Sequence, residues 1–171
     1  MPSYSESKDR DPVFKKENFD ILTLEDEIRA DKLCVRYLRV FYLELVEKEN
    51  LSPLEAGSLA QGADYFLREF LIPDRRENIF SPSHGRVRQF AGYWYIVRNM
   101  EPNMAELQQI LRGVQVFYGF CKKTGKVSAA LADEVQKECC DLDFFRNRIE
   151  DFWNIEGDGY LEWERVCSLK D

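Results

Sequence analysis

The chain has 171 residues, and its 44% hydrophobic and 13% aromatic side chains are enough to bury one core of single-domain size. Its longest apolar run, residues 90–97, is far shorter than the roughly 20 residues that a transmembrane helix needs, and residues 1–11 lack the apolar core of a signal peptide. We therefore expect a cytoplasmic protein that has no membrane partner.

The five cysteines are odd in number and include no C-x-x-C pair. This pattern is typical of reduced thiols, and Cys34 and Cys121 fall on apolar helix faces, where cysteine acts as a small hydrophobic residue. With its single histidine, the chain also lacks the ligands of a two-histidine metal site. We expect neither a metal nor another cofactor.

The formal net charge of -7 is unevenly distributed along the sequence. Residues 1–56 carry 9 basic and 13 acidic side chains, residues 57–126 carry 10 and 6, and residues 127–171 carry 5 and 12. Because phosphates repel an acidic surface, the total charge disfavours a nucleic-acid partner. The basic middle of the chain leaves a local nucleic-acid site open.

The N-terminal residues 1–20 are polar and show no hydrophobic periodicity. We expect them to form a mobile tail in which Phe14 and Phe19 are docking points. The remaining residues, 21–171, are predicted to form a single α-helical domain.

Capping residues mark the first three predicted helices. Thr23 precedes three acidic residues and opens a helix that continues to about residue 48. Ser52, Pro53 and Glu55 form a capping box that opens a second helix, which ends before residue 73. Ser81, followed by a proline, is predicted to open the third helix.

Two further helices follow in the same pattern. Asn103 caps the fourth, Gly125 supplies the left-handed residue that ends it, and Ser128 caps a fifth that continues to about residue 153. No segment of comparable length alternates with period two. The sequence therefore predicts an all-α fold: one bundle of about five helices, then a short C-terminal turn and a helix or strand. Its core should include Phe66, Leu111, Val114 and Phe117.

The sequence contains no recognisable catalytic machinery. It lacks the phosphate-binding loop GxxxxGK[ST], the dinucleotide-binding GxGxxG and the zinc motif HExxH. Its one histidine, His84, has no partner that identifies a Ser-His or Cys-His pair. We expect no enzymatic function.

The best candidate for an anion or nucleic-acid site is the basic segment 75–88. Arginine pairs bidentately with phosphate, and the start of the third helix adds the positive end of its dipole. The candidate residues are Arg75, Arg76, His84, Arg86 and Arg88. The simpler interpretation is a solvated charged loop in which Asp74 and Glu77 are the local partners of the arginines.

Residues 154–165 are similar to the first part of an EF-hand calcium loop. Oxygen donors occupy positions one, three, five and nine, and Gly159 occupies position six. Position twelve, which should carry a bidentate glutamate, is Arg165. We therefore expect a degenerate loop without calcium, and a turn into a terminal element that pins Leu161 and Trp163 to the core.

Residues 62–127 resemble the N-terminal, SAM-like core-binding domain of phage integrases and related tyrosine recombinases. The similar segments read YFLREFL, RVRQFAGYWYIV and MAELQQILRGVQVFYGFCKKTG, followed by Gly-Lys-Val. In that family the domain clamps DNA beside a separate catalytic domain. The His-x-x-Arg of that catalytic domain is not matched, because Val87 stands three residues after His84. The resemblance implies a compact helical module and DNA contact.

These observations predict a non-catalytic binding module with a protein partner. Two alternatives remain: a nucleic-acid-binding domain that uses the basic loop 75–88, and a degenerate EF-hand-like helix-loop-helix at 154–165. The sequence does not indicate an oligomeric state or a pathway.

Overall fold

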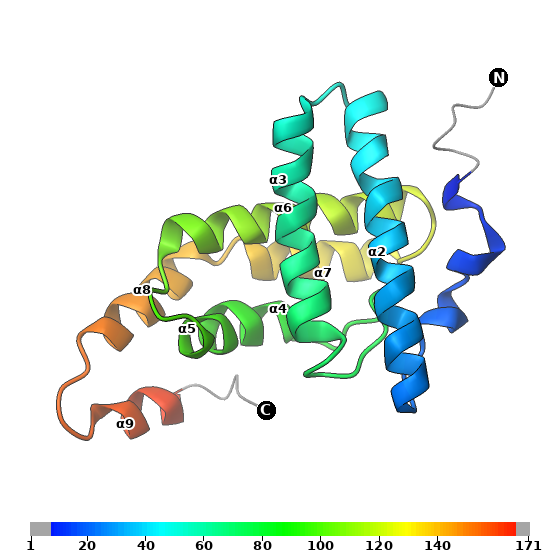
Figure 1. Ribbon diagram of the computed structural model, residues 1–171. Helices are drawn as coiled ribbons and strands as arrows, with labels where there is room; N and C mark the ends of the chain where they lie inside the picture. The colour runs from blue at the N-terminus through cyan, green and yellow to red at the C-terminus, as the bar shows by residue number, and fades with distance from the viewer. Residues whose placement is uncertain (1–7, 167–171) are drawn as a thin grey trace.

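The computed structural model describes residues 8–166, which contain helices and no strand (Figure 1). Two short 3-10 helices, η1 (Pro12–Phe14) and η2 (Lys16–Phe19), precede the long helix α2 (Leu24–Glu47). The predicted all-α fold is confirmed.

The N-terminal segment packs along α2 (Figure 1). Phe14 and Phe19 are buried, as docking points would be, and the carboxylate of Asp9 accepts a buried hydrogen bond of 2.7 Å from the Tyr37 hydroxyl. Lys126 Nζ donates to the Phe14 carbonyl oxygen over 2.8 Å. Residues 8–20 therefore belong to the folded domain, which corrects the expectation of a mobile tail for them; residues 1–7 lie outside the described part of the chain.

The second helix begins at its predicted capping box and stands beside α2. Thr23 and Asp26 cap α2 reciprocally, and Ser52 and Glu55 do the same for α3 (Pro53–Asp64). The helix continues without interruption into the π-helical segment η3 (Tyr65–Leu71).

The third helix begins later than predicted. It consists of α4 (Arg86–Gln89), the π-helical η4 (Phe90–Trp94) and α5 (Tyr95–Arg98). Its N-cap is Gly85 at a φ of 82°, so the chain is left-handed where a helix begun at Ser81 would have to be right-handed. The prediction that Ser81 opens this helix was wrong.

The next helix, α6 (Met104–Lys123), crosses α3 at short range. A Cβ atom at Gly113 would lie 2.3 Å from the carbonyl oxygen of Leu59, and one at Gly62 would lie 3.0 Å from the Cα of Ile110. The two backbones can approach this closely only because both positions lack a side chain. Asn103 caps the helix as predicted, and Gly125 follows it at a φ of 77°.

The predicted fifth helix is divided in two. Ser128 caps α7 (Ala129–Cys139), and α8 (Leu142–Trp153) follows after a break at which Asp141 has a non-helical ψ of 50°. The apolar spacing continues across the break, which is why the sequence predicts one helix. The C-terminal element is a helix, α9 (Gly159–Val166).

The core contains the residues predicted for it. Phe66, Leu111, Val114 and Phe117 are all buried. Burial raises the pKa of the buried thiols of Cys34 and Cys121, which act as small apolar side chains in the core.

None of the described helices combines the length and apolar character needed to span a bilayer.

Candidate functional site

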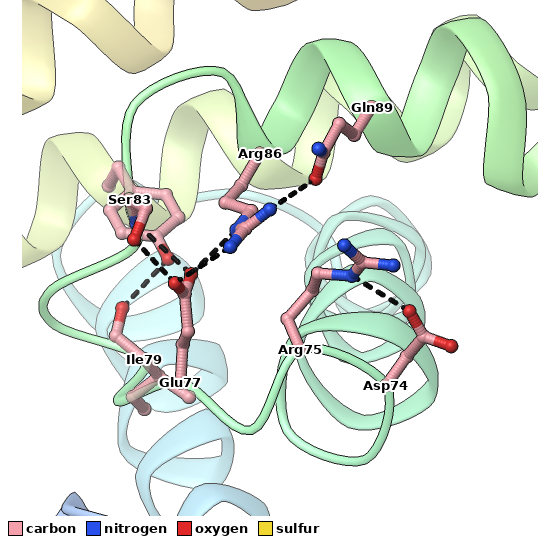
Figure 2. Close-up of polar contacts among 8 residues, drawn as sticks. Asp74, Arg75, Glu77, Ile79, Ser83, Arg86 and Gln89 are labelled. Carbon is pink, nitrogen blue, oxygen red and sulfur yellow. Dashed lines mark hydrogen bonds and ion pairs between the residues drawn. The ribbon is translucent and has the colours of Figure 1, made fainter. Parts of the chain in front are cut away.

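The arginines of segment 75–88 do not converge on one point. Figure 2 shows Arg86 directed at Glu77 and Gln89, whereas Arg75 is directed at Asp74. Arg86 Nε lies 3.0 Å from Glu77 Oε1, and its Nη1 lies 2.6 Å from Gln89 Oε1. Arg75 Nε lies 2.8 Å from Asp74 Oδ2. Both pairings match the interpretation of a charged loop with local partners.

The other candidates of this segment also have partners within the fold. Arg76 Nη1 lies 3.1 Å from Glu27 Oε2 of α2, and the Arg88 guanidinium carbon lies 4.3 Å from the centre of the Phe144 ring. His84 is largely exposed and contacts Glu134 of α7. These side chains extend toward three different helices, so the structure does not bring them together as an anion site.

The pKa of the Glu77 carboxyl group reflects its ion pair with Arg86. Burial raises the pKa of this carboxyl group, but hydrogen bonds from Arg86 and Ser83 lower it by more, so the net shift is downward. The ion pair is mostly shielded from solvent, with 18% of the Arg86 side chain and 15% of the Glu77 side chain exposed. Arg86 therefore stabilises the loop through Glu77.

The segment 154–165 is organised by Arg148 and Trp163. Arg148 donates hydrogen bonds of 3.0 Å to the carbonyl oxygens of Gly92 and Trp163, and its guanidinium carbon lies 3.8 Å from the centre of the Trp163 ring. Trp163 is buried as predicted, but Leu161 is exposed, so only one of the two expected anchors reaches the core. Within residues 8–166, no three His, Cys, Asp or Glu side chains are grouped as metal ligands.

A groove of about 420 Å³ lies between the C-terminal parts of α2 and α6, the connection from α2 to α3, and Leu59 of α3. We call it the α2–α3–α6 groove. Its lining includes five apolar side chains, of which Leu51 and Val116 are partly exposed. The others are Leu45, Leu59 and Phe120. A groove of this size and lining has room for an apolar side chain.

Charged residues also line this groove. Glu44 is buried and lies 3.0 Å from Lys123 Nζ and 3.4 Å from Lys48 Nζ, and Glu49 lies 3.6 Å from the same Lys123. Arg112 is exposed and has no ion pair with any carboxylate of the described residues. Among the charged groups that line the groove, Arg112 is therefore the one without an ion pair in the described residues.

The sequence prediction missed this groove. Its α6 side is formed by Arg112, Val116, Gly119 and Lys123, which follow each other at steps of four, three and four residues along one helix face. The sequence contains that spacing. It does not show that α2 forms another side of the groove, because the position of α2 depends on the close crossing of α3 and α6. Two of the glycines in the interior of helices, Gly62 and Gly113, were the available signal.

Comparisons of the chain with protein-family models, with curated proteins and with solved structures gave no match. The function must therefore be argued from the residues themselves.

Proposed function

We propose that this chain is a non-catalytic binding module that holds a segment of a protein partner in the α2–α3–α6 groove. The observation that carries the proposal is the combination of an apolar lining with a guanidinium that has no carboxylate partner in the described fold. Protein interfaces combine an apolar centre with a polar rim, and arginine is enriched in them.

Gly119 supports the proposal. It lies in the interior of α6, where glycine costs roughly 0.5 to 1 kcal/mol relative to alanine, yet a Cβ atom there would meet nothing within 4 Å. Unlike Gly62 and Gly113, it is therefore not required by helix packing. A glycine on the edge of a groove leaves room for the backbone of a bound segment.

The charges that line the groove determine which charge the bound segment should carry. Glu44 and Glu49 already interact with lysines, whereas Arg112 can pair with an added carboxylate. The fitting ligand is a peptide segment with an apolar anchor residue and an acidic residue close to it. This assignment also favours a protein partner over nucleic acid, because three of the predicted nucleic-acid contacts, Arg75, Arg76 and Arg86, are held by carboxylates.

The cysteines support a reducing, cytoplasmic location. Cys34, Cys121 and Cys139 are buried free thiols, and Cys140 is an exposed free thiol. Exposed free thiols persist in compartments that keep cysteine reduced.

A selection from a phage-displayed library of random peptides tests the proposal. The wild-type protein should enrich peptides that combine an apolar anchor with an acidic residue. Gly119→Trp should abolish the enrichment by filling the groove, and it should leave the helix intact because tryptophan has a higher helix propensity than glycine.

Gly57→Trp is the matched control. Gly57 also lies inside a helix with nothing within 4 Å of its potential Cβ, and it does not line the groove. This variant should enrich the same peptides as the wild type. Equal enrichment by the Gly119→Trp and Gly57→Trp proteins, or no enrichment by the wild type, would contradict the proposal.

A further inference from the structure

A separate pocket of about 210 Å³ lies where the N-terminal segment runs along the middle of α2. Its apolar lining consists of Phe14 from η1 and of Val40 and Leu43 from α2. The volume suits a small group with a short organic attachment, since pockets for larger ligands typically exceed about 300 Å³. We call it the α2 pocket.

Three cationic side chains line the α2 pocket, and one carboxylate faces them. Lys8, Arg36 and Arg39 supply the positive charges, and Asp11 supplies the negative one. The Asp11 carboxylate accepts a hydrogen bond of 2.9 Å from the backbone N–H of Val13, because it caps η1. Arg36 and Arg39 alone bring two positive charges to the lining, in a protein whose net charge is -7.

The two arginines of the pocket have no acidic neighbour on their own helix. The residues three and four positions away from Arg36 and Arg39 include no aspartate or glutamate, although such spacing is where helical ion pairs form. Neither arginine has an ion pair with any carboxylate in residues 8–166, and the Arg36 guanidinium carbon lies 5.7 Å from the centre of the Phe14 ring. Two like charges three residues apart repel, so this pair does not serve the stability of α2.

We propose that the α2 pocket binds a phosphate monoester. At neutral pH this group carries close to two negative charges, which match the charges of Arg36 and Arg39. Arginine presents a planar fork that pairs bidentately with phosphate oxygens, and Arg36 and Arg39 offer two such forks from one helix face. The apolar residues of the pocket contact the organic part of the ester. A phosphorylated side chain and a free small phosphate ester share this chemistry.

An NMR titration of the wild-type protein with phenyl phosphate tests the proposal. Amide signals of residues 36–43 and of Asp11, Val13 and Phe14 should shift and saturate. Arg36→Gln and Arg39→Gln should each weaken binding about tenfold or more, because each removes a charge-assisted hydrogen bond. Arg165→Gln removes the same charge from an exposed arginine that lines neither the α2 pocket nor the α2–α3–α6 groove, so it should change the affinity less than twofold.

Two results would overturn the proposal. One is the absence of saturation in the wild type up to about 10 mM phenyl phosphate. The other is an equal loss of affinity in Arg39→Gln and Arg165→Gln, which would indicate general attraction of anions. The stability of each variant is followed by thermal unfolding, and a chemical-shift spectrum that stays native separates lost binding from lost folding.

A second set of probes identifies the source of the ester. A peptide with one phosphotyrosine that binds at least tenfold more tightly than phenyl phosphate assigns the site to a phosphorylated protein. Equal affinities for the two probes assign it to a small phosphate ester. A single-stranded oligonucleotide that binds more tightly than both, with a steep dependence on salt, would replace the proposal with nucleic-acid binding.

Discussion

The arginines of segment 75–88 and those of α2 differ in whether the described fold gives them a carboxylate partner. In segment 75–88, Arg75, Arg76 and Arg86 form ion pairs with carboxylates of the protein, and one of those carboxylates comes from the distant helix α2. On α2, Arg36 and Arg39 line a pocket and have no carboxylate partner among the described residues. The segment with the densest basic sequence is therefore not the one with the most available charge.

The difference shows that the availability of an arginine depends on the acids that folding places next to it. Segment 75–88 lies in the basic middle of the chain, whereas Arg36 and Arg39 lie in its first third, which has more acidic than basic side chains. Most of those acids are used elsewhere: Glu27 pairs with Arg76, and the buried Glu44 pairs with two lysines. A count of charges along the chain cannot show these pairings.

The largest expected effect comes from Arg86. Arg86→Gln should lower the free energy of unfolding by about 2 to 3 kcal/mol, because Glu77 would remain mostly buried without its charged partner. Urea unfolding at pH 7 measures this difference. A change below about 0.5 kcal/mol would show that the pair contributes no more than an exposed one.

The pH dependence of stability should reveal the same ion pair. Because the pKa of Glu77 is lower in the folded than in the unfolded protein, its ionised form stabilises the fold above the unfolded-state pKa. That contribution is lost as the pH falls through the folded-state pKa. The unfolding free energy of Glu77→Gln should therefore change less between about pH 7 and pH 3 than that of the wild type. An equal change in both proteins would contradict the assignment.

Arg76 should contribute less than Arg86. Its side chain is 46% exposed where it meets Glu27, and exposed ion pairs contribute about 0 to 1 kcal/mol. Arg76→Gln should lower the unfolding free energy by less than about 1 kcal/mol, in the same urea experiment. A decrease in unfolding free energy as large as that of Arg86→Gln would show that the exposed pair and the shielded pair contribute equally.

The smallest effect is expected on α2. Arg36→Gln and Arg39→Gln should each change the unfolding free energy by less than about 0.5 kcal/mol, because neither side chain has an ion pair to lose in the described fold. In Arg36→Gln, relief of the repulsion between the two arginines should offset the lost packing on Phe14. A destabilisation above about 1 kcal/mol would identify a structural role for these arginines.

Much of the fold follows from local signals that the sequence contains. The capping boxes at Thr23 and Ser52 and the left-handed Gly125 depend on residues within a few positions, and all three are present in the structure. The third helix begins late because Glu77 binds Ser83 and Gly85 turns the chain, and both effects belong to the folded loop.

The candidate sites were harder to predict, because they depend on contacts between distant residues. Arg76 and its partner Glu27 are separated by 49 positions, and Arg88 donates its backbone N–H to Glu138, 50 positions away. The α2 pocket requires the N-terminal segment to dock on α2, whereas the polar composition of that segment predicts a tail. For the α2 pocket, the absence of acids at helical spacing from Arg36 and Arg39 was the one local signal.

The most direct test of this distinction is the mobility of the arginine side chains, measured by NMR of their Nε–Hε groups in the protein without ligand. Arg86 should show restricted rotation of the guanidinium and slow hydrogen exchange, because it donates to Glu77 and Gln89. Arg36 and Arg39 should show fast rotation and fast exchange, as expected for guanidinium groups without a carboxylate partner in residues 8–166. Equal rates of guanidinium rotation and hydrogen exchange for Arg36, Arg39 and Arg86 would contradict the distinction between paired and unpaired arginines.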